Sequence, residues 1–515
     1  MNNKKDGKYY LEIPRIPGEY WWGGAAIEGI RMPVAPGETY TIDLTRNDTY
    51  NQASALFVSN MGRYLWSKKG FRLCIGEKIT VWDGDSEIIY GEGAGTLKGA
   101  VEEVKQYFFA PHRIPPETMF STPQYCTWIE LMYNQNQADI LAYARGILES
   151  GLPAGELIID DCWQEYYGRW RFHDGRFPNP KKMVEELHGM GFSVLLWICP
   201  FVSPDTVEYR ELESRDILLR DASGKPAIRE WWNGYSAVLD LSNPRAVEWF
   251  REQTDRLMRE YGVDGFKLDA GDAMYYESTD RPFDSQCDPN GQSGLWAGLA
   301  MEYPYNELRA CFNNGGMPIV QRLCDKRHRW DEENGLGALV PDALINGILG
   351  YYYVCPDMIG GGQFADFLHE EQIDTELFIR SCECSSMMPM MQFSYAVWKH
   401  KELSVDEIVS QYAHFHKKMG NLILTLAQNA ARKGEPMIRY MEYEFPHEGL
   451  ADVNDQFMLG SEYLVAPVVT KGMRKRSVRL PRGRWRYDYT GECFEGGQTI
   501  EVDAPLEVLP WFQKA

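Results

Sequence analysis

The sequence predicts an α/β protein, a (β/α)8 TIM barrel with an N-terminal β-sandwich and a small C-terminal all-β domain. Three observations support this fold class. Apolar strand-like runs alternate with segments of helical periodicity over about 320 of the 515 residues. These strand-like runs are apolar almost throughout, as in parallel strands covered on both faces. The segments on either side of this region alternate with a period of two, which is typical of half-buried strands.

The first part of the chain, residues 1–117, is expected to form the β-sandwich. Residues 38–45 place apolar side chains on one face and polar side chains on the other. Shorter β-rich runs follow at 78–82 and 86–90, separated by Gly and Asp. No long helix is predicted within this part, so a sheet domain is the simplest interpretation.

The barrel is expected over residues 118–446. Gly191 ends one of its helices, because glycine readily adopts the conformation that follows a helix C-terminus. The first strand–helix repeats are a helix at 140–148, a strand at 156–160, a helix at 181–190 and a strand at 192–198.

The second half of the barrel is less regular. Ser242-Asn243-Pro244 begins a helix with a capping residue and a first-turn proline. Strands are expected at 265–268 and 318–323. Between them, residues 273–316 are rich in Pro, Asn, Gly and Asp, so we expect a long loop on the functional face of the barrel. Residues 447–515 alternate again and form the C-terminal β-domain.

Composition restricts the function. The formal net charge of −21 disfavours a nucleic-acid partner, since a phosphate backbone would be repelled. No apolar run of membrane-spanning length exists, and no apolar run follows the basic start, so we expect a cytoplasmic protein. Eleven dispersed cysteines without a CxxC pair indicate free thiols in a reducing compartment. Aromatic residues make up 13% of the chain and favour a carbohydrate ligand. A homo-oligomer is compatible with these features.

Polar residues at the ends of the predicted barrel strands are the candidate active site. We expect several carboxylates and two cations to lie close together there. The members are Asp160, Asp161, Trp197, Lys267, Asp269, Arg322, Asp325 and Asp357.

This set suits glycoside cleavage, in which one carboxylate attacks the sugar carbon and another protonates the departing oxygen. Lys267 shares a strand face with Asp269 and would keep it ionised, so Asp269 is the candidate nucleophile and Asp325 the acid/base. A single aspartate at a strand end more often caps a helix or stabilises a turn, and we assign Asp264 and Asp272 to that class. Zinc is not predicted, because no HExxH motif or suitable ligand spacing occurs.

Two other functions remain open at this stage. A barrel of this kind could bind sugar without catalysing a reaction. It could also hold magnesium through Asp160, Asp269 and Asp357, although Lys267 beside Asp269 speaks against a divalent cation there.

Several long stretches resemble glycoside hydrolase family 31. They include LIIDDCWQEYYGRW, GVDGFKLDAGD, NGLGALVPDALINGILGYYYVCPDMIGGG, LFIRSCECSSMMPMMQF and the C-terminal FMLGSEYLVAPVV. The resemblance extends over nearly the whole chain in the family's order. It is greatest for an α-galactosidase-type branch, and it implies a retaining mechanism on α-linked sugars without metal or cofactor.

The resemblance also implies residue roles. The family's nucleophile falls on Asp269 and its acid/base on Asp325, although Arg322 and Asp325 are closer together than is usual. Sugar contacts are implied for Asp160 or Asp161, for Trp197 and for Asp357. We add Lys267, Arg322, Trp128 and Gln392 to the expected substrate contacts.

One departure bears on the substrate. Typical α-glucosidases of this family carry an Arg-x-His where this chain has Gln392 and Ser394. A site without that imidazole cannot hold the glucose hydroxyls in the same way. We therefore expect an exo-acting α-galactosidase, with α-glucosidase, α-xylosidase and sulfoquinovosidase as alternatives.

Overall fold

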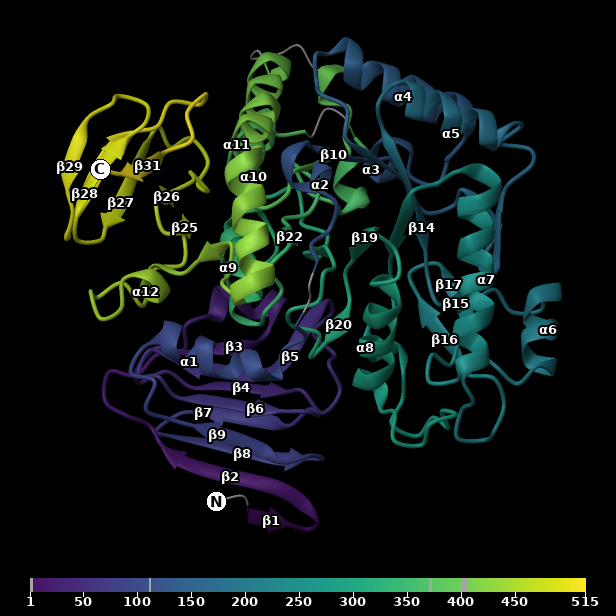
Figure 1. Ribbon diagram of the computed structural model, residues 1–515, viewed down its shortest axis with the longest axis horizontal. Helices are drawn as coiled ribbons and strands as arrows, with labels where there is room; N and C mark the ends of the chain where they lie inside the picture. Colours follow the sequence, from purple (N-terminus) through teal and green to yellow (C-terminus); the bar gives the residue numbers. More distant parts are fainter. Residues whose placement is uncertain (1–2, 111–112, 370–372, 400–404) are drawn as a thin grey trace.

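The computed structural model describes residues 3–110, 113–369, 373–399 and 405–515. Figure 1 shows an N-terminal sheet region in purple, a central barrel in blue to green and a C-terminal β-domain in yellow. The predicted fold class is confirmed. No helix among the described residues is both long and apolar enough to cross a membrane.

Two sheets form the N-terminal region, as predicted. Their buried faces follow the alternation of the sequence, since Tyr40 and Ile42 are buried and their neighbours Thr41 and Asp43 are exposed. The first sheet has the order β1 (Asn3–Lys5), β2 (Lys8–Pro14), β8 (Lys78–Gly84), β7 (Arg72–Ile75) and β4 (Tyr40–Asp43). The second contains β5 (Gln52–Ser59), β6 (Tyr64–Ser67) and β9 (Ile88–Gly91), with β3 (Trp21–Ala25) against β5. Helix α1 (Leu97–Val104) follows.

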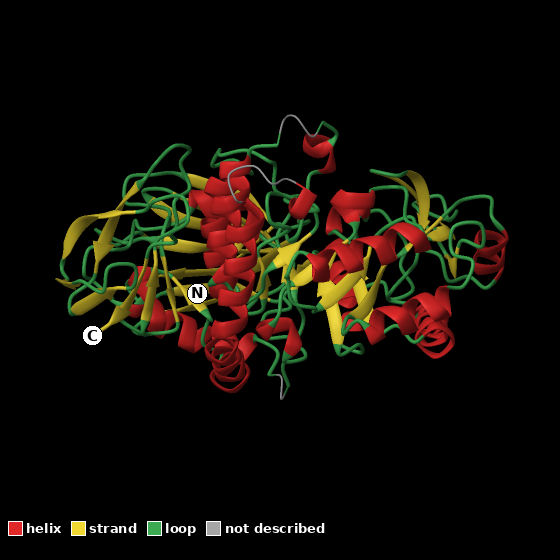
Figure 2. Cartoon of the chain, turned by 90° about the horizontal axis from the view of Figure 1, so that it is seen from above, coloured by secondary structure: helices red, strands yellow, loops and turns green. Residues whose placement is uncertain are grey.

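The central sheet is an eight-stranded parallel barrel. An isolated bridge joins Met358, three residues beyond the first strand of the sheet order, to Gln392 of the last, so the barrel is nearly closed. Figure 2 shows helices flanking these strands in a view from above. The strand order is β22 (Val354–Cys355), β21 (Gln321–Arg322), β19 (Tyr305–Leu308), β18 (Gly265–Leu268), β14 (Ser193–Ile198), β11 (Glu156–Ile159), β10 (Gln124–Cys126) and β23 (Gln392–Phe393).

The capping residues predicted for the outer helices are present. Asn243 accepts a hydrogen bond from Arg245 N at the start of α7 (Pro244–Tyr261). Gly191, just beyond α5 (Pro180–Gly189), has φ +94°. The other α-helices of the barrel region are α2 (Thr118–Ser121), α3 (Trp128–Leu131), α4 (Gln137–Glu149), α6 (Val207–Ser214), α8 (Pro289–Ala300), α9 (Leu336–Ile348), α10 (Thr375–Ser386) and α11 (Val405–Lys433).

The prediction of a long loop at 273–316 is wrong. This stretch contains helix α8, barrel strand β19 and strand β20 (Cys311–Phe312), which pairs with β5 of the N-terminal sheet. Helix α8 is glycine-rich and buried on several sides, so it lacks the amphipathic period that identifies most helices. Strand β19 carries buried polar residues and does not resemble an apolar strand. The strand expected at 318–323 is only the two residues of β21.

Two antiparallel insertions lie at the strand ends. One is the hairpin β12 (Gln164–Tyr166) and β13 (Arg169–Phe172) after β11. The other lies between β14 and α7 and contains β15 (Phe201–Val202), β17 (Gly234–Val238) and β16 (Ile228–Trp231).

The C-terminal region is antiparallel and has its own hydrophobic core around Trp485 and Phe512. Its first strand lies before the expected boundary at 446. Helix α12 (Met441–Glu444) follows that strand. The larger sheet has the order β24 (Ile438–Arg439), β25 (Phe457–Leu459), β26 (Tyr463–Val465), β31 (Trp511–Lys514), β28 (Arg484–Tyr487) and β29 (Cys493–Glu495), and β27 (Lys475–Leu480) pairs with β30 (Gln498–Asp503).

Candidate active site

A cleft of about 470 Å³ opens where the barrel strands end. Most of the barrel strands contribute side chains at or just beyond their last residue, which is where active sites of this fold form. The lining contributed in this way includes Asp160 and Asp161 after β11, Trp197 on β14, Lys267 and Asp269 at the end of β18, and Arg309 and Arg322 at the ends of β19 and β21.

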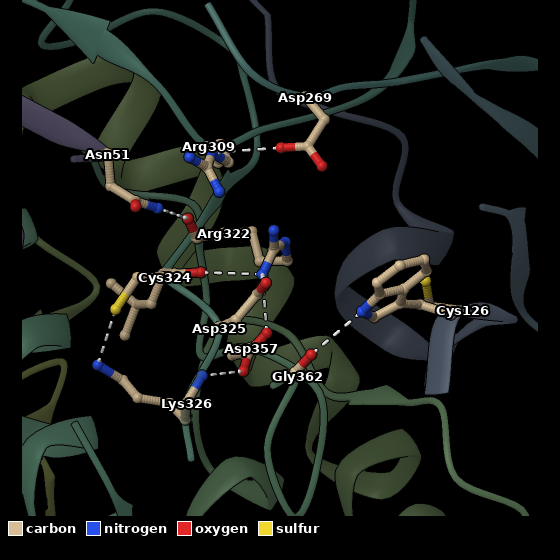
Figure 3. Close-up of polar contacts among 12 residues, drawn as sticks. Asn51, Cys126, Asp269, Arg309, Arg322, Cys324, Asp325, Lys326, Asp357 and Gly362 are labelled. Atoms are coloured by element: carbon tan, nitrogen blue, oxygen red, sulfur yellow. Dashed lines mark hydrogen bonds and ion pairs between the residues drawn. The ribbon is translucent and has the colours of Figure 1, made fainter. Parts of the chain in front are cut away.

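Asp269 is held as an ionised carboxylate. Trp197 Nε1 donates to its Oδ2 at 2.7 Å, and Arg309 Nε lies 3.3 Å from its Oδ1. Figure 3 shows the Asp269 carboxylate directed at Arg309. Burial alone would raise the pKa of Asp269, but the charges of Arg309, then Lys267 and Arg322, lower it to about 2. The group is therefore charged throughout the neutral range.

Asp325 lines the same cleft in a wetter environment. Its side chain is 33% exposed, whereas that of Asp269 is 10% exposed. Arg322 NH1 donates to Asp325 Oδ1 at 2.6 Å and to Asp357 Oδ1 at 2.8 Å, as Figure 3 shows. The same guanidinium lies 3.3 Å from Glu307 through Nε. Three carboxylates therefore share one cation, and Asp325 is the most exposed of them.

Asp357 lies behind Arg322 and does not face the cleft directly. Its Oδ2 accepts a hydrogen bond from Lys326 N at 2.7 Å, so it fixes both Arg322 and the segment that follows Asp325. Burial raises the pKa of Asp357 to about 6, although Arg322 opposes the shift.

The floor of the cleft carries a buried ion pair. Lys267 Nζ lies 2.7 Å from Asp160 Oδ2, and both side chains are 4% exposed. Cys126 Sγ also donates to Asp160, at 3.0 Å. Each partner compensates the charge of the other, so loss of either one would leave an uncompensated charge in a buried position.

Asp161, next to Asp160 in the chain, contacts Tyr167 and Asn233. Tyr167 OH and Asn233 Nδ2 donate to its Oδ2 at 3.0 and 2.6 Å. Burial, followed by the charge of Asp160, raises the pKa of Asp161 to about 7. This carboxyl therefore changes its charge near neutral pH.

The magnesium arrangement considered for Asp160, Asp269 and Asp357 has no support here. Each of the three carboxylates is within ion-pair distance of a protein cation. Within the described ranges, no group of three His, Cys, Asp or Glu side chains is arranged to hold a metal ion.

Comparison with protein families decides the identity of the barrel. The model of the glycosyl hydrolases family 31 TIM-barrel domain matches residues 113–426, and that of the family's C-terminal domain matches residues 434–515. The chain belongs to glycoside hydrolase family 31. The resemblance found in the sequence is thereby confirmed.

The chain is similar to curated proteins that have different names. Myogenesis-regulating glycosidase of Mus musculus is 29% identical over 530 residues, covering 95% of this chain and 73% of the relative. Sulfoquinovosidase of Escherichia coli is 28% identical over 370 residues, covering 67% of this chain and 53% of the relative. The chain thus spans about half the length of the bacterial relative.

Solved family 31 structures share the fold. A Flavobacterium johnsoniae dextranase complexed with glucose has a TM-score of 0.85 at 19% identity, and the match covers all of this chain and 67% of that one. A sulfoquinovosidase from E. rectale has a TM-score of 0.83 at 20% identity, covering 98% and 82%.

Most of the predicted site residues meet in the family 31 cleft. Trp128, directly after β10, lines it and donates through Nε1 to Gly362 O at 3.2 Å. Two predicted residues do not line the cleft. Asp357 lies behind Arg322, and Gln392 is fully buried on β23, where it donates to Gln124 Oε1 and Glu307 Oε2 inside the barrel. The expected substrate contacts of Asp357 and Gln392 are therefore not supported by the lining of the cleft, and they stay predictions.

Sequence reasoning missed several residues of this cleft. Arg309 was hidden in the stretch assigned to a loop, yet it directly follows a barrel strand and contacts Asp269. Asp272, which we assigned a structural role, does not line the cleft but supports two residues that do, since it accepts a hydrogen bond from Arg309 NH2 at 2.8 Å and from Asn51 N at 2.9 Å. Tyr50 and Asn51 reach the cleft from the N-terminal region, both with positive φ. A pair of adjacent strained residues is visible only in coordinates.

Proposed function

We propose that this family 31 chain is a retaining, exo-acting α-glycosidase that hydrolyses α-galactosides, with Asp269 as nucleophile and Asp325 as acid/base. The observation that carries the proposal is the contrast between these two carboxylates. Asp269 is enclosed by donors and cations, and Asp325 is a partly exposed carboxyl on the same cleft. Two carboxyl groups in unlike environments are the pattern that separates a nucleophile from a proton donor.

Asp269 supplies the covalent step in this proposal. Its oxygen attacks the anomeric carbon and displaces the aglycone, forming a glycosyl-enzyme ester. The Trp197 indole and the Arg309 guanidinium fix the carboxylate so that an oxygen faces the cleft. These groups also stabilise the carboxylate when it departs in the second step.

Asp325 moves the proton. In the first step it donates to the departing oxygen, and in the second it accepts a proton from the attacking water. Its 33% exposure gives it access to solvent between the steps. Arg322 orients it through one oxygen, which leaves the other available to the substrate.

The form of the cleft supports a terminal sugar as substrate. The buried Lys267–Asp160 pair closes the floor, and the Trp128 indole and Phe364 form a wall with ring centroids 5.7 Å apart. A closed floor accepts the end of a sugar chain and excludes its middle.

Two features favour a galactoside among the substrates of the family. No histidine occurs among the described residues that line the cleft, and Ser394, where α-glucosidases carry the imidazole, is buried with its Oγ accepting from Ile129 N. The three cations of the described lining, Lys267, Arg309 and Arg322, all pair with carboxylates. A sulfonate would need a cation that is not already neutralised, so sulfoquinovosides fit less well.

The substrate assignment is tested with four p-nitrophenyl α-glycosides, namely the galactoside, glucoside, xyloside and sulfoquinovoside. We expect the galactoside to have the highest kcat/KM, because its recognition does not depend on the missing imidazole. Turnover of the glucoside with an inert galactoside would overturn the substrate assignment and leave the mechanism standing.

Trp197→Phe tests the control of the nucleophile's charge. Loss of the indole donor raises the pKa of Asp269 above about 2. A lowered carboxyl pKa keeps the group ionised above that value, so raising it moves the acidic limb of kcat/KM to higher pH. The measurement is the pH profile of kcat/KM.

Trp163→Phe is the matched control. Its indole is also buried, but it donates to the backbone oxygen of Trp197 at 2.8 Å and not to a carboxylate. We expect its acidic limb to coincide with that of the wild type. Equal displacement in both variants would show that general loosening of the barrel, and not the hydrogen bond to Asp269, causes the change.

A further inference from the structure

The tip of the β16–β17 hairpin reaches into the cleft from the insertion after β14. Trp231 pairs with Gly234, and Gly234 has φ +97°, so Trp232 and Asn233 form the turn. A glycine in this conformation completes a tight hairpin turn. The hairpin therefore delivers two adjacent side chains to the site, and Trp232 lines the cleft while remaining 42% exposed.

Asn233 ties this tip to the barrel. Its Nδ2 donates to Asp161 Oδ2 at 2.6 Å and to Tyr167 OH at 2.7 Å. Its Oδ1 accepts a hydrogen bond from Tyr133 OH at 3.2 Å. One amide thus joins the segments that carry Asp161, Tyr167 and Tyr133. Its NH2 group donates to the first two, and its oxygen accepts from the third.

Trp232, the other residue of the turn, contacts Arg309 on the side of the nucleophile. The Arg309 guanidinium lies over its ring, 4.9 Å from the centroid, and the same Arg309 contacts Asp269. The neighbouring rings of Trp231 and Tyr275 pack edgewise against Trp232, at 4.9 and 6.3 Å. The indole therefore forms a wall beside the nucleophile, and its position depends on how the turn is held.

We propose that Asn233 is a positioning residue that clips the hairpin tip to Asp161 and thereby fixes Trp232 against Arg309, setting the affinity of the cleft for its sugar. This inference rests on the proposed glycosidase function. The amide matches its place because it can donate to a carboxylate without adding charge. A carboxylate at the same place would repel Asp161 instead.

That difference provides a test. In Asn233→Asp, two carboxyl groups face each other at hydrogen-bond distance and cannot both ionise without strong repulsion. At low pH they share one proton, and the resulting O–H···O bond restores the clip. The pKa of Asp161 is already about 7, and a second carboxyl group raises it further, so both groups lose their protons and release the tip only at a pH well above 7. The titratable groups beside Asp161 that act on this equilibrium are Asp160, Cys162, Tyr167, Cys199 and Tyr133.

The experiment measures kcat and KM for p-nitrophenyl α-D-galactopyranoside from pH 5 to pH 9. At pH 8.5 we expect Asn233→Asp to lower kcat/KM by about 10- to 100-fold, mainly through KM, as for a misplaced positioning group. At pH 5.5 most of that loss is recovered relative to the wild type. Asn233→Ala, which introduces no second carboxyl group, is expected to lower kcat/KM at both pH values.

Asn136→Asp is the matched control. Asn136 also donates to a carboxylate, Asp139 Oδ2 at 2.7 Å, but it caps α4 and does not line the cleft. We expect its kcat/KM to follow that of the wild type at every pH. A pH-independent loss in Asn233→Asp, an unchanged KM, or the same pH response in Asn136→Asp would overturn the proposal.

Hydrogen–deuterium exchange of residues 228–238 reports the clip without any substrate. We expect Asn233→Asp to exchange faster than the wild type at pH 8.5 and at the same rate at pH 5.5. Wild-type protein that turns over none of the aryl glycosides would defeat the proposed function, and this measurement would still decide on the clip. Unchanged exchange at both pH values would contradict it.

Discussion

Asp269→Asn is expected to lower kcat for p-nitrophenyl α-D-galactopyranoside by about 10⁴-fold or more, the scale on which removal of a covalent nucleophile acts. The amide cannot form the glycosyl ester, even though it retains the shape of the carboxylate. The contact with Arg309 also loses its charge attraction. Added azide is expected to restore turnover and give the β-galactosyl azide, because the small anion replaces the missing carboxylate on that face.

Asp264→Asn is the control for this result. Asp264 directly precedes the same strand, β18, and binds His188 and Val194 N at the opposite end of the barrel from the cleft. We expect its kcat to stay close to that of the wild type. Retention of substantial activity by Asp269→Asn, with no effect of azide, would remove Asp269 from the covalent step.

Asp325→Ala is expected to separate substrates by their leaving groups. A poor leaving group needs the proton, so kcat/KM for an α-galactosyl disaccharide should fall by about 10²- to 10⁴-fold. The fluoride of α-galactosyl fluoride departs with far less need of a proton. The first step, transfer of the galactosyl group to the enzyme, should therefore proceed in the variant at a rate much closer to that of the wild type. The galactosyl-enzyme then accumulates, since water lacks its base, and a burst precedes slow turnover.

Azide provides the diagnostic for Asp325→Ala. It attacks the accumulated intermediate without a base, and the product should be the α-galactosyl azide, opposite in configuration to that of the Asp269 variant. Asp357→Ala is a useful comparison, because Asp357 binds the same Arg322 but does not line the cleft. Equal losses for all leaving groups in Asp325→Ala would assign it a binding role only.

The sequence predicted the barrel from its most regular elements. Strands such as β14 are apolar throughout, and helices such as α7 carry both a capping Asn and a first-turn Pro. Local chemistry decides the structure there. Strand β19 was missed because its buried residues Asn306 and Glu307 are polar, and Glu307 finds its partner Arg322 only on another barrel strand. Tertiary contacts outweigh local pattern at such positions.

The candidate site, like the barrel, was predictable where its residues lie on or directly after regular strands. Asp160, Asp269 and Arg322 follow recognisable strands, so their convergence could be expected before any coordinates were known. Asn233 and Tyr50 could not be placed, because each comes from a turn outside the barrel repeat. The sequence Trp231 to Gly234 contains an Asn-Gly pair, which indicates a hairpin turn but not that its tip reaches Asp161.

The central claim is that a sugar is transferred to Asp269, and trapping that ester tests it most directly. The wild-type protein is incubated with 5-fluoro-α-D-galactosyl fluoride, digested with protease and sequenced by mass spectrometry. The account predicts one added fluorogalactosyl group, carried by Asp269 in the peptide that contains GFKLDAGD. A label on another carboxylate, or turnover of the probe with direct release of the inverted sugar and no label, would contradict it.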